Sequence, residues 1–218
     1  ANGDTRTDGD GNIYLSSPGE HVIYRISASR GELFAGRRNQ AGFVDGDGDS
    51  ARFDYPTGLG IDPRTDGGLY VADTENNAIR KVSFSREVRR VAGSPAGTPG
   101  TMITDFTDLS AAVFRSPRGV VSLSGDLIVA DSANHALYYV DVSRGQVHLL
   151  AGVPGVAGFA DGAFDAARFS SPSGLAINQD GTLLAVADTG NDRVRIVELV
   201  RDDAGAIRGQ VTTAGAAS

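Results

Sequence analysis

The sequence predicts an all-β fold, a β-propeller of four-stranded blades, because one unit of strand-like runs recurs along the chain. Three of these units carry an aspartate at the end of an apolar run, Asp73, Asp131 and Asp188, and these lie 58 and 57 residues apart. Each unit holds four short apolar runs separated by Gly, Asp, Asn and Pro, and none is long enough for an ordinary helix. A long self-similar period indicates one supersecondary unit repeated several times. Stacking four-stranded units around an axis leaves only short exposed edges, which favours a propeller.

The first unit is incomplete. Residues 13–17, 22–26 and 32–36 match the second, third and fourth strands of a blade, whereas residues 1–11 have the composition of a turn. We therefore expect the first blade, over residues 12–36, to lack its inner strand.

Three fuller units follow, and we expect blades over residues 55–93, 116–152 and 171–215. In the first of these the strand-like runs are 58–62, 69–73, 78–83 and 87–93. The Val-Ala-Asp blocks are apolar at successive positions, as in strands buried on both faces. We interpret residues 1–218 as a section of a larger propeller whose terminal blades expose sheet edges, open to the remaining blades of the same or another chain.

Two sets of residues give the chain a resemblance to a known family. The segment Asp131-Ser-Ala-Asn134-His135-Ala-Leu137 resembles the NHL repeat, named for its Asn, His and Leu. The segments between units also resemble that family, with Gly-Phe-x-Asp-Gly and Ala-Arg-Phe patterns at 42–53 and again at 158–169. The resemblance covers most of the chain and implies a propeller that closes with about six blades. NHL propellers bind proteins or RNA and are rarely enzymes, so the fold alone does not give the function.

Composition excludes several kinds of site. The chain has 218 residues and no Cys, so it has neither disulfides nor a thiolate nucleophile or metal ligand. It has no Trp, which argues against a WD-type propeller, and no apolar run approaches membrane-spanning length. We expect no membrane insertion, and the composition leaves the cellular compartment unknown.

Two acidic patterns resemble metal sites. Asp45-Gly-Asp47-Gly-Asp49 begins like a calcium loop, but Ser50 and Pro56 stand where the EF-hand pattern needs Gly and Glu. We interpret this segment as a solvated loop between blades. The repeated aspartates could form a ring of carboxylates, but each precedes an asparagine by three residues. This spacing favours hydrogen bonds that close a turn, so we assign a structural turn role to Asp73, Asn76, Asp131, Asn134, His135, Asp188 and Asn191.

The histidines do not form a convincing zinc site. His21 and His135 occupy one position of the repeat, which Asn77 and Asp192 fill in the other units. This position therefore supplies only two histidines, whereas catalytic zinc usually takes three protein ligands. A metal-assisted enzyme of the lyase or lactonase kind remains the alternative function. The predicted inner strands offer it only three polar residues, Asp62, Ser122 and Asn178. We expect no catalytic residue, no metal and no cofactor.

The charge argues against nucleic acid. The net charge is −7, whereas phosphate binding depends on clustered Lys and Arg. Arg80 and Arg195 share a repeat position, but Tyr24 and Tyr138 fill it in the other units, so no basic ring is expected. RNA binding is the less favoured function.

One segment breaks the repeat. Thirteen residues separate Gly93 from Phe106, against seven between Gly36 and Phe43. Insertions in regular repeats lie on loops and often mark a binding face, although an idle insertion would look the same. We assign a partner-binding role to Thr98, Thr101, Met102, Ile103, Thr104 and Asp105. Together these features predict a non-catalytic scaffold that binds a protein, or alternatively a glycan, within a larger assembly.

Overall fold

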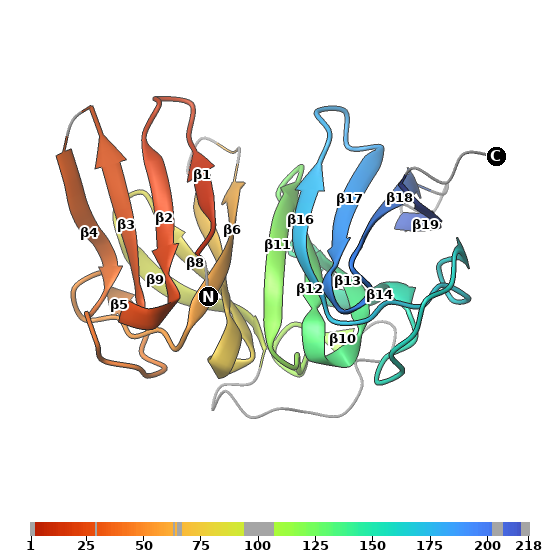
Figure 1. Cartoon of the computed structure of the whole chain (residues 1–218). Helices are drawn as coiled ribbons and strands as arrows, with labels where there is room; N and C mark the ends of the chain where they lie inside the picture. Colours follow the sequence, from red (N-terminus) through yellow and green to blue (C-terminus); the bar gives the residue numbers. More distant parts are fainter. Residues whose placement is uncertain are drawn as a thin grey trace.

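The computed structural model describes residues 3–28, 30–62, 64, 67–93, 107–201 and 207–214. These residues form four antiparallel sheets, one per blade, which follow one another around the molecule (Figure 1). The inner strands gather near a common axis, where the Arg6 guanidinium of the first blade donates to the Leu175 carbonyl of the fourth, at 3.4 Å. The prediction of an all-β fold with four blades is confirmed.

Blade 1 is a four-stranded sheet in the order β1 (Thr5–Thr7), β2 (Ile13–Ser17), β3 (Val22–Ser27) and β4 (Arg30–Gly36). The expectation that this blade lacks an inner strand is wrong. The three residues of β1 pair with β2, and the Asp4 N–H donates to the Ser16 hydroxyl at 2.7 Å. Strand β1 is held by backbone hydrogen bonds to β2 rather than by burial of its side chains. Its Thr-Arg-Thr sequence is therefore polar and lacks the apolar pattern by which a strand is predicted.

Blades 2, 3 and 4 each have four long strands in sequence order from the inside outward. Blade 2 has β6 (Pro56–Asp62), β7 (Gly68–Asp73), β8 (Ala78–Ser83) and β9 (Glu87–Gly93). Blade 3 has β11 (Pro117–Leu123), β12 (Asp126–Asp131), β13 (Ala136–Asp141) and β14 (Gln146–Gly152). Blade 4 has β16 (Pro172–Ile177), β17 (Leu183–Asp188), β18 (Arg193–Arg201) and β19 (Ile207–Thr213).

A fifth, two-residue strand covers the outer edge of blades 2, 3 and 4. These strands are β5 (Gly46–Asp47), β10 (Thr107–Asp108) and β15 (Gly162–Ala163). Each comes from the linker before its blade and pairs with the outermost long strand, β9, β14 or β19. The acidic segment expected to be a solvated loop therefore includes an edge strand. An edge covered in this way offers fewer free backbone groups to another chain.

A short 3₁₀ turn follows the second long strand of every blade: η1 (Pro18–Glu20), η2 (Thr74–Asn76), η3 (Ser132–Asn134) and η4 (Thr189–Asn191). The next residue, His21, Asn77, His135 or Asp192, has left-handed backbone angles with φ between 52° and 61°. Asn, Asp and His are enriched in this region among residues with a side chain, which explains the slot they share in the sequence. No helix in the described residues is long and apolar enough to cross a membrane.

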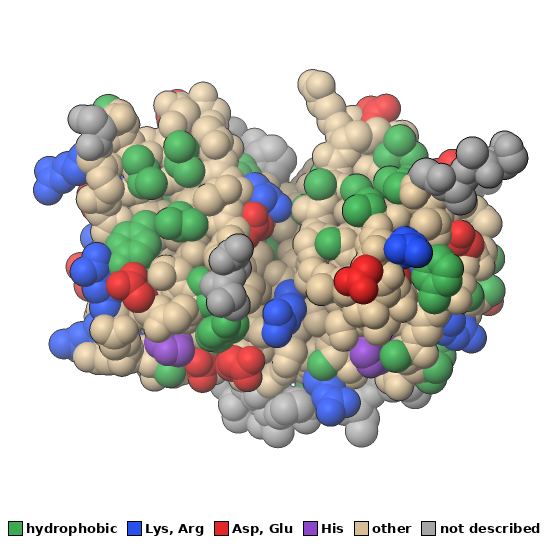
Figure 2. Space-filling view, in the orientation of Figure 1, with side chains coloured by type: hydrophobic (Ala, Val, Ile, Leu, Met, Phe, Trp, Pro, Cys, Tyr) green, Lys and Arg blue, Asp and Glu red, His purple; other side chains and the backbone are tan. Residues whose placement is uncertain are grey.

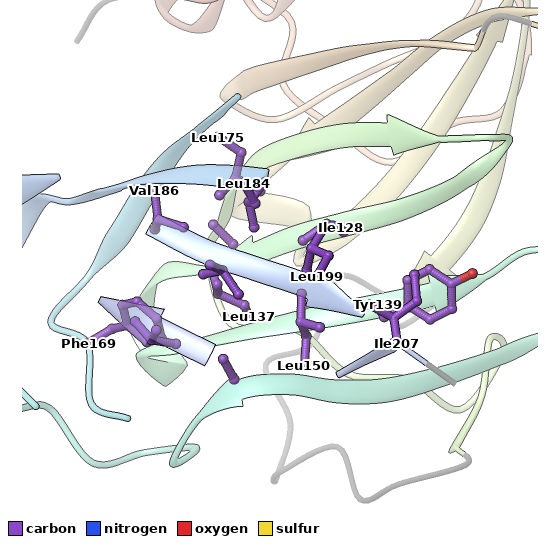
Figure 3. Packing of buried hydrophobic residues seen from close by; sticks show 14 of the residues in the cluster. Ile128, Leu137, Tyr139, Leu150, Phe169, Leu175, Leu184, Val186, Leu199 and Ile207 are labelled. Carbon is purple, nitrogen blue, oxygen red and sulfur yellow. The ribbon is translucent and has the colours of Figure 1, made fainter. Parts of the chain in front are cut away.

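Buried apolar side chains hold consecutive blades together. One face of blade 3, with Ile128 and Leu137, packs on the opposite face of blade 4, with Leu184 and Val186 (Figure 3). Equivalent clusters join blade 1 to blade 2 and blade 2 to blade 3. Because β7 and β12 are buried on both faces, their sequences are apolar at successive positions. Each buried aliphatic side chain contributes about 1.5–3 kcal/mol, so these interfaces stabilise the stacking of the blades.

Glycine lets the inner strands approach closely. A Cβ added to Gly58 of β6 would overlap the Arg118 carbonyl oxygen of β11. A Cβ added to Gly119 would overlap the Ser173 carbonyl oxygen of β16 in the same way. The Pro-x-Gly pattern of the inner strands is therefore required by the contact of backbone with backbone near the axis.

We expect Gly119→Ala to lower the free energy of unfolding by about 3 kcal/mol, because the new methyl group meets backbone that cannot move aside. Gly19→Ala is the matched control, since a Cβ there meets no atom within 4 Å. It should change stability by less than about 0.5 kcal/mol. Urea unfolding of the two variants at unchanged m-value measures both effects. Equal stability of the two variants would contradict the role assigned to Gly119.

Candidate binding surface and the charged groups around it

A buried aspartate ends the second strand of blades 2, 3 and 4. In blade 2, Asp73 is 0% exposed, and its carboxylate accepts from the Asp54 N–H at 2.7 Å and from the Asn76 side chain at 2.8 Å. The first donor belongs to the linker before the blade and the second to the turn η2. The carboxylate therefore fastens the linker to the turn.

Blades 3 and 4 repeat this arrangement. Asp131 accepts from the Arg115 N–H and the Asn134 side chain, both at 2.7 Å. Asp188 accepts from the Ser170 N–H at 2.7 Å and the Asn191 side chain at 2.8 Å. The aspartates and asparagines singled out in the sequence thus lie together at the turns. In blade 1, where Ser17 replaces the aspartate, its hydroxyl donates to Glu20 at 3.3 Å.

A fully buried arginine lies beside the aspartate in blades 2 and 4. The Arg80 guanidinium donates to Asp73 at 2.9 Å and to Asp45 of the linker at 2.5 Å. The rings of Phe43 and Phe53 lie 4.6 and 5.2 Å from its central carbon. The aromatic faces and the two carboxylates together compensate for removing this charge from water.

Blade 4 repeats the buried arginine with equivalent partners. Arg195 donates to Asp188 at 2.9 Å and to Asp161 at 2.6 Å, between the rings of Phe159 and Phe169. Although burial raises the pKa of Asp161, hydrogen bonds from Arg195 hold it below its usual value. This cluster was not predicted from the sequence. Its signal was the joint presence of Gly-Phe-x-Asp-Gly in the linker and Arg in the third strand of the same blade.

Blades 1 and 3 fill the arginine position with tyrosine. Tyr138 packs edge-on against Phe114 with ring centroids 6.1 Å apart. Burial raises the pKa of Asp131 to about 7, against hydrogen bonds from Arg115 and Asn134 that lower it. Burial also raises the pKa of Asp73, and there the Arg80 charge opposes the rise.

In blades 1, 2 and 3, the residue after the turn binds the linker that enters the next blade. The Tyr55 N–H donates to His21 Nδ1 at 3.1 Å, and the Ser171 N–H donates to His135 Nδ1 at 3.0 Å. At the junction between blades 2 and 3, Asn77 Oδ1 accepts from the Ser116 N–H at 2.8 Å. The two histidines thus use Nδ1 as an acceptor, in separate junctions.

The polar residues considered for a metal site have other partners or lie apart. Asp62 is buried and accepts from Lys81 and Arg64, each at 2.7 Å, which hold its pKa well below the usual range although burial opposes this. Asn178 accepts from two backbone N–H groups of its own turn, whereas the buried Ser122 hydroxyl has no hydrogen-bond partner among the described residues. Of the acidic loop, Asp45 and Asp49 pair with Arg80 and Arg86. The described residues bring no three His, Asp or Glu side chains together as a metal site.

An open groove of about 640 Å³ runs along the inner strands, between blades 1 and 4. Figure 2 shows the surface hollowed between the two halves of the molecule. The groove is lined mainly by small and apolar residues of β6, β11, β16 and β17, with charged groups from Asp4, Arg6 and Arg118. Arg6 pairs with Asp4 at 2.7 Å. Arg118 is exposed, and within the described residues no carboxylate pairs with it.

The segment assigned to partner binding lies outside the described residues. This applies to Thr98, Thr101, Met102, Ile103, Thr104 and Asp105, so their role remains a prediction.

The chain is similar in sequence to a known domain family and to parts of two longer proteins. Residues 41–198 match the family model of the teneurin NHL domain. The chain is 30% identical over 194 residues to the chloroplastic protein SUPPRESSOR OF QUENCHING 1 of Arabidopsis thaliana, covering 86% of this chain and 18% of that protein. It is 29% identical over 210 residues to human NHL repeat-containing protein 2, covering 86% of this chain and 28% of that protein. The chain thus spans less than a third of the length of either relative.

Solved structures share the fold at low identity. A protein of unknown function from Bacteroides thetaiotaomicron superposes with a TM-score of 0.69 at 18% identity, covering 95% of this chain and 46% of that one. A gluconolactonase from Xanthomonas campestris superposes with a TM-score of 0.59 at 14% identity, covering 91% and 58%. At such identities the likeness concerns the fold.

The raised pKa of Asp131 predicts a pH-dependent stability. The carboxyl titrates near its ordinary value of 3.8 when unfolded and at about 7 when folded, so its contribution is full below about pH 4 and falls until about pH 7. Asp131→Asn removes this titration while keeping an acceptor for the Arg115 N–H. We therefore expect the variant to gain stability relative to the wild type from pH 5 to pH 7, as measured by urea unfolding at several pH values.

Asp10→Asn is the control for this experiment, because Asp10 is exposed. Its difference from the wild type should stay flat over the same range. A flat difference for Asp131→Asn as well would show that Asp131 is not shifted upward.

The junction hydrogen bond at His135 predicts a second set of variants. His135→Asn should change the free energy of unfolding by less than about 0.5 kcal/mol, since Asn77 accepts the same bond with similar backbone angles. His135→Ala should cost about 2 kcal/mol, because it leaves the Ser171 N–H unpaired and places alanine at positive φ. His135→Gly separates these causes, since glycine removes only the strain. Equal stability of the Asn and Ala variants in thermal unfolding would contradict this role.

Proposed function

The chain belongs to the NHL-repeat family, and we propose that it is a non-catalytic propeller section that binds a protein through the groove along its inner strands. The observation that supports this proposal most is that Arg118 is unpaired by any described carboxylate, whereas the other charged groups near the axis form ion pairs. Asp62 pairs with both Lys81 and Arg64, and Arg6 pairs with Asp4. Among the charged groups that line the groove, Arg118 has no pairing carboxylate in the described part of the chain, so its guanidinium can bind a partner.

The groove favours a particular kind of partner. Its wall is formed by residues such as Val120, Leu175 and Ala176, which offer apolar contact without long side chains. A polypeptide segment with apolar residues and one carboxylate fits this surface, because Arg binds a carboxylate through two parallel N–H groups. The net charge of −7 does not suit nucleic acid, and Arg80 and Arg195 are fully buried, away from any phosphate.

We expect random linear peptides displayed on phage and selected on this chain to be enriched in acidic residues flanked by apolar ones. Arg118→Ala should weaken the selected peptides about tenfold, because a carboxylate then loses its partner. Arg118→Lys, which keeps the charge but not the two-pronged geometry, should lose less. Fluorescence anisotropy with labelled peptides measures each affinity. Selection without acidic enrichment, or affinities unaffected by both variants, would contradict the proposal.

The metal-assisted alternative is supported by the likeness of the fold to a gluconolactonase. An active centre of that kind would need ligands beyond Asp62 and Asn178, both of which bind neighbouring groups of their own chain. Gluconolactone hydrolysis with added Zn²⁺, Ca²⁺ or Mn²⁺ tests it directly. We expect no acceleration over buffer containing the same metal. A rate that EDTA abolishes and that Asp62→Asn lowers would favour the enzyme instead.

A further inference from the structure

The three junctions between consecutive blades are closed by one kind of hydrogen bond with two kinds of acceptor. In each, the residue before the inner-strand proline donates its N–H to the side chain that follows the preceding turn. The acceptor is His21 Nδ1 in the first junction, Asn77 Oδ1 in the second and His135 Nδ1 in the third, at 3.1, 2.8 and 3.0 Å. Two junctions therefore depend on an imidazole, and one depends on an amide.

The donor residues have an unfavourable backbone conformation. Tyr55, Ser116 and Ser171 have φ angles of 56°, 51° and 49°, and each precedes a proline. Positive φ is strained for a residue with a side chain, and a following proline favours extended backbone. The acceptor side chain thus holds a residue that would otherwise extend, and with it the start of β6, β11 or β16.

Only a neutral imidazole can make this hydrogen bond. Nδ1 accepts a hydrogen bond when the ring hydrogen lies on Nε2, whereas a protonated ring carries hydrogens on both nitrogens and has no acceptor. Imidazole side chains change charge between about pH 5 and pH 8, and an amide does not. Acidification therefore removes the acceptor from the first and third junctions and leaves it in the second.

The surroundings of the two histidines differ. Asp54 Oδ1 lies 3.3 Å from His21 Nδ1, so a protonated ring there gains an ion pair as it loses the Tyr55 N–H. In the third junction Ser170 stands in the place of Asp54. Among the described residues no carboxylate forms an ion pair with His135. Protonation at the third junction is therefore not compensated by a new partner.

The other charged groups near His135 are bonded elsewhere or exposed. The charged residues in or beside turn η3 and the linker end that it binds are Arg115, Asp131, Arg168 and Asp188. Both aspartates accept backbone N–H groups of the linkers. Arg168 donates to three carbonyls of its own linker, and Arg115 is exposed. The linker that leaves η3, residues 153–156, carries no charge.

We propose that the third junction is a pH-sensitive joint, in which protonation of His135 releases the Ser171 N–H and loosens the attachment of β16 to blade 3. The first junction exchanges its hydrogen bond for the His21–Asp54 ion pair, and the second keeps its bond to Asn77. Ser173 follows the released residue and its proline and lines the groove. The joint therefore couples pH to the position of one wall of the groove.

The test compares amide hydrogens of the wild-type chain by NMR at about pH 7.5 and about pH 5, on either side of imidazole titration. Each exchange rate is corrected for the intrinsic rate at that pH. We expect Ser171 to lose protection at least about fivefold on acidification, because its N–H then exchanges through local opening. The Ser116 amide, bound to Asn77, is the control within the same molecule and should keep its protection.

His135→Asn places the acceptor of the second junction in the third. In this variant the protection of Ser171 should be the same at both pH values. The Tm of the variant relative to the wild type should be higher at pH 5 than at pH 7.5 by about 2 °C or more. Both chains keep Asp131, so its own titration cancels in this difference, and the same pair in the Asp131→Asn background checks the cancellation.

His21→Asn is the matched variant at the first junction. Its Tm relative to the wild type should change less with pH than that of His135→Asn, because Asp54 compensates for protonation of His21 in the wild type.

Three outcomes would overturn the proposal. One is unchanged protection of Ser171 at pH 5 in the wild type. Another is equal loss of protection at Ser171 and Ser116, which would indicate general opening of the blades. The third is a loss at Ser171 that persists in His135→Asn, since it would not come from the imidazole. These measurements contain no peptide, so failure of binding at Arg118 and failure of the joint are separate results.

Discussion

The carboxylates of Asp73, Asp131 and Asp188 have no exposure to water, and each accepts hydrogen bonds from two parts of the chain that would otherwise move independently. The linker N–H and the asparagine of the turn converge on one side chain. An uncompensated buried carboxylate would cost several kcal/mol, so the surrounding donors are a condition for the fold. The position of the linker, of the edge strand that it supplies and of the next junction all depend on this one group.

Different blades surround the end of the second strand with different hydrogen-bonding residues. Arg80 and Arg195 supply a buried positive charge in blades 2 and 4, held between two phenylalanine rings and a second aspartate of the linker. Blade 3 replaces the arginine with Tyr138, and its aspartate accepts only from the Arg115 N–H and the Asn134 side chain. Blade 1 uses Ser17 and Glu20 instead. The same turn geometry thus occurs with a charged, a neutral or a reversed set of hydrogen-bond partners.

This internal use of charge bears on function. The acidic groups that first suggest metal binding, Asp45, Asp73 and Asp188 among them, pair with arginines inside the blades. Within the described residues, the groove along the inner strands is the surface that we assign to a partner. It is a surface of contact rather than a cluster of reactive groups, which is why protein binding is the function that we propose.

The sequence by itself determined the repeat, the four blades, the strands of blades 2 to 4 and the turns, because apolar spacing and turn residues are local properties. It also placed His21 and His135 in one slot with Asn77, since left-handed backbone selects such residues. It did not show β1, whose Thr-Arg-Thr sequence has no apolar pattern. Nor did it show the edge strands β5, β10 and β15, which form by pairing with a strand about 40 to 50 residues away. The burial of Arg80 likewise depends on Phe43, Asp45 and Asp73 meeting in space. Tertiary structure decided these features because each rests on partners distant in the chain, which local propensity does not report.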